Sequence, residues 1–215
     1  MIRRDWIVRK PVNRTKVHIA QAAIELFSRQ GFGSTSIREI AQKANVNSAL
    51  ISYHFKNKQG VLEMIMIEYF ENLFERFAVQ RIERTTEAFN YFDELMKIVQ
   101  LLIRYQCEHI KVTRMIQREL SVDSTLVREV MSTYIAKLKA LFTSLADEGI
   151  SAGQFRADLN QDMKLIHVLS SIFFPYFNPQ IIREVFYVDP MSEEYIETYI
   201  QYLANIWRSQ FVREN

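Results

Sequence analysis

Glycine and proline are scarce in this chain, and their scarcity excludes several classes of fold. The 215 residues include 5 Gly and 4 Pro, and none of these lies between Val61 and Glu148. A glycine-rich phosphate loop needs several glycines close together, and a many-stranded sandwich or barrel needs a turn about every 8–12 residues. A long stretch without either residue is typical of long helices. The sequence therefore predicts an all-α fold.

Cysteine and long hydrophobic runs are also lacking. The single cysteine, Cys107, excludes an intramolecular disulfide and a multi-cysteine zinc site, which favours a reduced compartment. No apolar run approaches the roughly 18 residues of a membrane span, and the charged residues 1–6 precede no apolar signal segment. The four histidines have no metal-ligand spacing, and no nucleophile–base motif stands out. We expect a cytoplasmic protein that is not an enzyme, with no metal and no cofactor.

Charge is distributed unevenly along the chain. Residues 1–60 hold 11 Lys/Arg against 3 Asp/Glu, a net charge of +8, whereas residues 61–215 carry −6. A basic first quarter attracts a polyanion and an acidic remainder repels one, so the two parts are expected to have different partners. The alternative is a chance clustering of charges on a solvated face.

Residues 14–60 contain three short helical patterns, and they follow a basic arm over 1–13. We expect the arm to be flexible or to reach a minor groove. Asn13 caps the first helix, which ends at Gly31, and Ser34 or Thr35 caps the second. The third helix, over 48–54, follows a tight turn at 45–47.

Residues 61–215 predict a larger helical domain. Asn57 caps a long fourth helix with a regular apolar face. Asp123 and Gly149 are expected to bound a later helix, and Pro175 and Pro179 to bracket a kink. After the fourth helix, further helices are predicted at about 87–106, 108–120, 123–148, 158–174 and 192–211. Asp158 or Asn160 is expected to begin the fourth of these, and Pro190 and Ser192 the last.

The second and third helices, joined by a tight turn, form a helix-turn-helix unit. A DNA major groove about 12 Å wide admits one helix, provided that this helix is anchored on one side and small or polar on the other. Leu50 and Ile51 are the expected anchors. The side chains left to face outward or sideways are Ser48, Ala49, Ser52 and His54.

Cationic and polar side chains surround this helix. Thr35, Ser36 and Arg38 lie near the N-terminus of the second helix, where backbone amides favour phosphate. Lys58 follows the third helix and is expected to neutralise backbone phosphate. For Arg38 a phosphate contact is favoured over a base contact. His54 either contacts a base or packs beneath the third helix.

Three strings of residues, 31–41, 44–46 and 51–58 with Leu62, resemble the N-terminal domain of TetR-type transcriptional regulators. The resemblance covers about residues 14–62. It implies an all-helical homodimer that represses transcription, with a C-terminal domain that often binds a small effector. Because a dimer places its two recognition helices about 34 Å apart on the duplex, we expect a near-palindromic operator. One departure is Ser52, where many relatives carry tyrosine, the aromatic here being Tyr53. The DNA contacts implied by the resemblance are Thr35, Ser36, Arg38, Ser48, Ala49, Ser52, Tyr53, His54 and Lys58.

The second half resembles one branch of the family, RefZ of spore-forming Bacilli, over residues 123–134 and 175–179. This resemblance implies a DNA-bound protein that acts on the division protein FtsZ during sporulation. Two hypotheses therefore stand, a regulator of transcription and a regulator of cell division.

Two further groups of residues are candidates for ligand and partner binding. Aromatic and methionine side chains of the middle helices either line an effector cavity or form ordinary core: Phe70, Phe74, Met96, Tyr105, His109, Met115 and Phe142. The helices near 160–174 and 192–211 carry more apolar surface than one subunit readily buries, which predicts a four-helix dimer interface. Its expected members are Leu165, Val168, Leu169, Ile172, Tyr199, Tyr202, Leu203 and Ile206.

Overall fold

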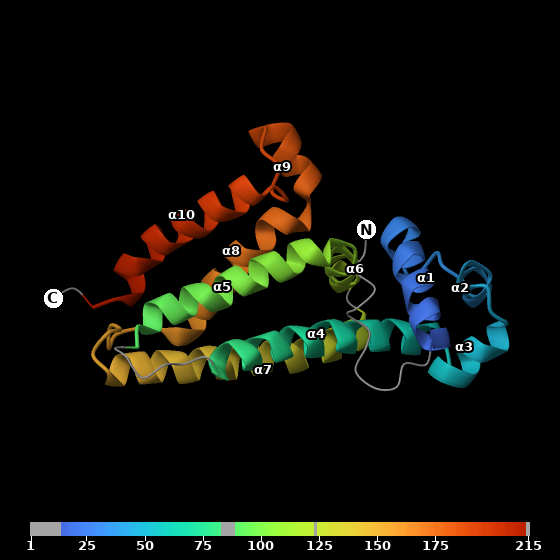
Figure 1. Ribbon diagram of the computed structural model, residues 1–215, viewed down its shortest axis with the longest axis horizontal. Helices are drawn as coiled ribbons and strands as arrows, with labels where there is room; N and C mark the ends of the chain where they lie inside the picture. The colour runs from blue at the N-terminus through green and yellow to red at the C-terminus, as the bar shows by residue number, and fades with distance from the viewer. Residues whose placement is uncertain (1–13, 83–88, 123, 214–215) are drawn as a thin grey trace. The chain divides into compact units, whose positions relative to one another are not determined.

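A computed structural model describes residues 14–82, 89–122 and 124–213 of the chain (Figure 1). Within these ranges it confirms the predicted all-α fold, because strand-like pairing is limited to one isolated bridge between Phe155 and Val212. The basic arm over 1–13 and the predicted caps Asn13 and Asp123 lie outside the described residues. No single described helix is long and apolar enough to cross a membrane. The helices Gln161–Phe177 and Pro179–Phe186, with a bend of 78° between them, reach that length and hydropathy only as a pair.

The helices follow the predicted order closely, with one addition. The helix over 179–186 was not predicted as a separate element. The elements are α1 (Arg14–Gln30), α2 (Ile37–Ala44), α3 (Ser48–Phe55), α4 (Lys58–Ile82), α5 (Tyr91–Glu108), α6 (Ile110–Ser121), α7 (Thr125–Ser151), α8 (Gln161–Phe177), α9 (Pro179–Phe186) and α10 (Glu193–Phe211).

The chain forms two compact units. Unit 1 contains the residues up to Glu75 together with His109–Tyr134, and unit 2 contains Arg76–Glu108 and Ile135–Asn215. The long helices α4 and α7 each contribute one part to each unit. The predicted helix-turn-helix domain over 14–60 lies within unit 1.

Unit 1 is built around α1, which packs against both α2 and α6. Its core holds Phe27 of α1, Ile40 of α2 and Ile51 of α3, all fully buried. The apolar face of α4 closes the unit, with Leu62 and Ile65 also fully buried. These side chains stabilise the short helices, which would be marginal alone.

Polar caps fix where several helices begin. The side chain of Asn57 accepts the Gly60 N–H at 2.9 Å, and Asn160 and Ser192 cap α8 and α10, as predicted. The predicted cap of α2 was wrong: Ser36, rather than Ser34 or Thr35, accepts the backbone N–H of Glu39.

Two helices of unit 2 continue past their predicted ends. Gly149 was predicted to end α7 but lies inside it. A Cβ at this position would stand 2.5 Å from the ring of Phe155, so the position needs glycine to make room for that ring. α8 runs through Pro175 to Phe177. Proline cannot donate to the carbonyl four residues earlier, and the hydroxyl of Tyr199 donates to that carbonyl, of Ser171, at 2.9 Å instead. This bond explains why α8 tolerates an internal proline.

Candidate nucleic-acid interface

The short helix α3 is held by one side and exposed on the other. Ile51 is fully buried and Phe55 is 6% exposed, whereas Tyr53 is 81% exposed. Asn45 adopts the left-handed conformation at φ 54°, and Asn47 caps α3 through its side chain, so the two asparagines form the predicted tight turn. The exposed residues of α3 are Ser48, Ala49, Leu50, Ser52 and Tyr53.

The prediction that Leu50 anchors α3 was wrong. Leu50 is 38% exposed and lies on the outer side with Ala49. The inner stripe is set by Ile51 and Phe55, which are four residues apart, and a neighbouring position is rotated by about 100° from it. The i, i+4 spacing of Ile51 and Phe55 in the sequence could have shown that Leu50 lies outside the inner stripe. His54 is half-buried, with its ring between those of Tyr53 and Phe55.

The N-terminus of α2 presents one cation and a completed cap. Ser36 and Glu39 form a reciprocal capping box, and the hydrogen bond from the Ser36 hydroxyl holds the pKa of Glu39 below its usual value. Arg38, the residue before Glu39, is exposed. Thr35, in contrast, is 2% exposed, and its hydroxyl donates to the carbonyl of Gly31 at 2.8 Å. Its side chain therefore holds the loop between α1 and α2 together.

Lys58 is directed at the chain's own backbone. Its ammonium donates to the carbonyls of Phe32, Gly33 and Thr35 at 2.7, 3.3 and 2.6 Å, and it lies 4.4 Å from the centre of the Phe32 ring. An ammonium has three N–H donors, so the three carbonyls account for all of the hydrogen bonds that Lys58 can donate. The contacts also offset the charge of a lysine at a helix N-terminus.

The loop between α1 and α2 also contacts α6, and this contact was not predicted from the sequence. The carboxylate of Glu119, 7% exposed, accepts the backbone N–H of Phe32 at 3.4 Å. Gly31 has φ +90°, and a Cβ there would lie 2.8 Å from the guanidinium of Arg118. Within unit 1 the loop that precedes α2 is thus fixed by both α4 and α6.

The seven residues predicted to line an effector cavity are divided between the units. Phe70, Phe74, His109 and Met115 belong to unit 1, where Phe70 stacks on Tyr134 at 4.6 Å. Met96, Tyr105 and Phe142 belong to unit 2. Phe142 lines an apolar cavity of about 20 Å³ between α5, α7 and α8. That volume is about the size of one water, so the effector site stays a prediction.

Four of the eight predicted dimer residues lie on the inner side of α8 and α10. Leu165, Val168, Ile172 and Leu203 are each less than 9% exposed and pack inside unit 2. Residues that pack inside one subunit leave little surface for a partner, and the dimer interface stays a prediction. Leu169, Tyr199 and Ile206 are half-buried, and Tyr202 is 58% exposed. The large apolar side chains that α8 exposes are instead Met163, Ile166, Phe174 and Phe177.

The arrangement in unit 1 defines a class of protein. A supporting helix, a tight turn and an eight-residue helix held by its inner face form the architecture of a helix-turn-helix regulator.

Comparison with known proteins identifies the family. Residues 19–65 match the model of the bacterial regulatory proteins of the tetR family. The chain is 35% identical over 198 residues to a probable HTH-type transcriptional regulator of Bacillus subtilis (strain 168), YttP, covering 92% of this chain and 94% of that protein. It is also 24% identical to the transcriptional repressor KstR2 of Mycolicibacterium smegmatis, covering 72% and 73% of the two chains. The chain therefore belongs to the TetR family of transcriptional regulators.

Solved structures agree with this assignment of the fold. The fatty acid degradation regulator FadR of Bacillus halodurans superposes with a TM-score of 0.74 at 19% identity, covering 91% of this chain and 97% of that one. FadR of Bacillus subtilis, solved in complex with stearoyl-CoA, gives 0.71 at 18% identity, with 87% and 96% covered. The comparisons do not show the RefZ branch and do not support FtsZ as a partner.

Proposed function

We propose that this chain is a homodimeric repressor that places α3 in the DNA major groove. The observation that carries the proposal is the outer face of α3, which exposes two serines and three larger or apolar residues while Ile51 and Phe55 are buried on the inner face. The exposed residues are Ser48, Ala49, Leu50, Ser52 and Tyr53. Serine hydroxyls bond base edges, and apolar groups contact the thymine methyl. Two copies about 34 Å apart would read the two halves of a near-palindromic operator.

Genome-wide occupancy mapping tests this function. We expect near-palindromic sites within promoters, and increased transcription of the adjacent genes when the protein is deleted. Occupancy confined to the neighbourhood of the replication origin, with transcription unchanged, would contradict the repressor proposal. That result would favour the RefZ-like alternative, in which DNA serves as an address for a regulator of division.

Arg38 and Leu50 should affect binding in different ways. Arg38→Ala removes an exposed cation beside the N-terminus of α2. It should therefore weaken binding to every operator variant alike and reduce the magnitude of the slope of log K against log salt by about one. Leu50→Ala would remove an apolar base contact and should change the preference among operator variants at the contacted base pair, by no more than the roughly 1–3 kcal/mol that one mismatched base pair costs, with the salt slope unchanged. Fluorescence anisotropy over a salt series measures both effects. Equal losses on all sequences for both variants would contradict these roles.

The dimer in this proposal uses the outer faces of α8 and α10. From Leu165 to Phe177 α8 contains no charged residue, and Ile166 and Phe174 are 57% and 71% exposed. An uncharged helical face that remains exposed in one subunit is typical of an interface with a second copy.

A further inference from the structure

The helix α3 contains none of the side chains that identify a base by paired hydrogen bonds. In the major groove arginine or lysine identifies guanine, asparagine or glutamine identifies adenine, and a carboxylate identifies cytosine. The residues of α3, Ser-Ala-Leu-Ile-Ser-Tyr-His-Phe over 48–55, include none of these types. Its one imidazole, that of His54, is half-buried between two neighbouring rings. If α3 lies in the groove, it reads the sequence by another kind of contact.

The polar and cationic residues that flank α3 have other roles. The side-chain oxygen of Asn47 accepts the Ala49 N–H at 2.8 Å, which orients this amide toward its own helix. Lys56 follows α3 at its C-terminal end, whereas the N-terminal residues of a recognition helix reach the base edges. Arg38 lies on α2, the helix that crosses the phosphate backbone in this architecture. Base discrimination by α3 therefore falls to its own exposed residues.

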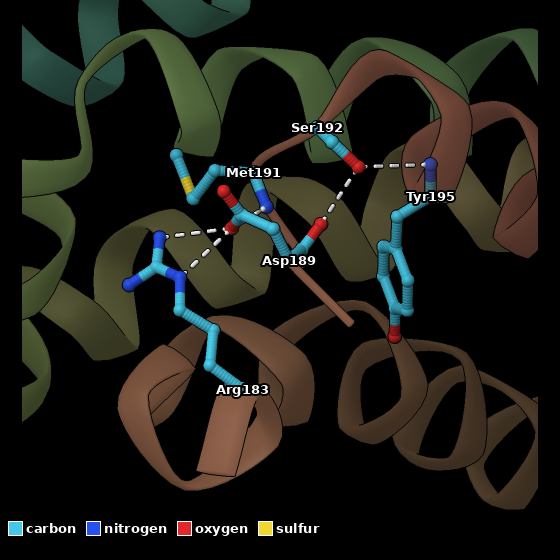
Figure 2. Close-up of polar contacts among 5 residues, drawn as sticks. All are labelled: Arg183, Asp189, Met191, Ser192 and Tyr195. Atoms are coloured by element: carbon cyan, nitrogen blue, oxygen red, sulfur yellow. Dashed lines mark hydrogen bonds and ion pairs between the residues drawn. The ribbon is translucent and has the colours of Figure 1, made fainter. Parts of the chain in front are cut away.

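Serine hydroxyls cannot supply this discrimination alone. A hydroxyl hydrogen rotates, so one oxygen can donate to one group and accept from another. Ser192 does both at once (Figure 2): its hydroxyl donates to the Asp189 carbonyl at 2.9 Å and accepts the Tyr195 N–H at 3.2 Å. Ser48 and Ser52, both exposed on α3, have the same freedom. They can pair with donors and acceptors alike and favour no one base.

The remaining outer surface of α3 is apolar or aromatic. Leu50 is 38% exposed, Tyr53 is 81% exposed, and Ala49 is exposed between the two serines. Tyr53 lies three positions from Leu50 and four from Ala49, so the three side chains share one face of the helix. Among the four bases only thymine carries a methyl group, on C5, into the major groove. Leucine and alanine methyl groups match it, because their contact removes apolar surface from water.

We propose that Leu50 and Ala49 read the 5-methyl group of thymine and that this contact sets the base preference of α3. The proposal rests on the proposed function, because it requires α3 in the major groove, and it names the chemical group of DNA that is recognised there. Each half of the operator then contains a thymine that faces this pair. A cytosine methylated on C5 carries the same group on the same atom, so it replaces that thymine better than cytosine does.

Base analogues in a selected duplex test the contact. Selection from random-sequence duplexes with the full chain supplies the sequence, and fluorescence anisotropy measures its affinity. Uracil keeps every hydrogen-bonding group of thymine and lacks only the methyl. We expect thymine→uracil at the contacted position to weaken binding about fourfold in one half-site and roughly fifteenfold in both, as for one buried methyl group each. Where that thymine is replaced by cytosine, 5-methylcytosine should bind about fourfold more tightly than cytosine.

Two leucines with almost the same exposure form a matched pair of variants. Leu50 is 38% exposed on α3 and Leu120 is 40% exposed on α6. Leu50→Ala should reduce the uracil effect at one position of each half-site to less than about twofold, whereas Leu120→Ala should retain the fourfold effect. Both side chains are partly exposed, so both variants should melt close to the wild-type temperature. The coupling between Leu50 and the methyl group is then measured without a change in folding.

Failure of the methyl contact and failure of the proposed function give different results. If uracil replaces every thymine of the selected duplex without loss of affinity, methyl reading is excluded while specific DNA binding stands. A uracil effect that is the same in Leu50→Ala and in the wild type at every position would also overturn the proposal, because the methyl group would then act through the shape of the DNA. A selection that enriches no sequence would overturn the proposed function itself, and the methyl contact with it.

Discussion

Gly60→Ala is expected to destabilise unit 1 and to abolish operator binding. A Cβ at this position in the first turn of α4 would lie far inside van der Waals contact of the carbonyl oxygen of Phe55. That oxygen belongs to backbone that cannot easily move, because the N–H of Asn57 donates to it at 2.8 Å across a tight turn in which Lys56 has φ +66°. The clash would therefore force α3 away from α4.

The expected loss is about 3 kcal/mol or more in the free energy of unfolding, as for severe overpacking. For a chain of this length the melting temperature should fall by roughly 6–12 °C, measured by circular dichroism. Gly33→Ala is the matched control, because nothing lies within 4 Å of the Cβ it would add, and it should retain both stability and DNA binding. A Gly60→Ala variant with wild-type melting and affinity would show that the α3–α4 junction is not rigid.

Patterns that act within one helix were predictable from the sequence. The spacing of apolar residues along α4 gave its buried face, and Asn57, Asn160 and Ser192 were identified as caps because a cap needs only its own helix. The left-handed turn at Asn45 follows from the same kind of local chemistry.

Features that depend on packing between helices were not predictable. From Leu165 to Phe177 α8 has no charged residue, and its apolar residues outnumber the polar ones and are spread around the helix. The periodicity therefore cannot distinguish the face inside unit 2 from the face left exposed. The carbonyl partners of Lys58 and the Phe32–Glu119 contact join segments 23 to 87 residues apart. Sequence spacing contains no information on either.

Lys58→Met is expected to weaken DNA binding by loosening the loop before α2 rather than by removing a phosphate contact. Methionine keeps most of the length of the side chain but donates no hydrogen bond. The carbonyls of Phe32, Gly33 and Thr35 would lose their shared donor, and those of Phe32 and Thr35 are partly buried. Leaving such groups without a donor costs about 1–3 kcal/mol each where water cannot replace it, so unfolding should become easier by roughly 2–3 kcal/mol.

Stability and salt dependence together distinguish the two roles of Lys58. If the lysine anchors the loop, Lys58→Met lowers the melting temperature and the operator affinity, while the salt slope stays at the wild-type value. If it binds phosphate, as the family resemblance implies, stability is unchanged and the slope falls by about one. Arg38→Ala supplies the reference for a pure phosphate contact, because Arg38 is exposed on α2. A Lys58→Met variant that behaves like Arg38→Ala in both measurements would contradict the anchoring role, since a lysine bonded to three carbonyls has no donor left for DNA.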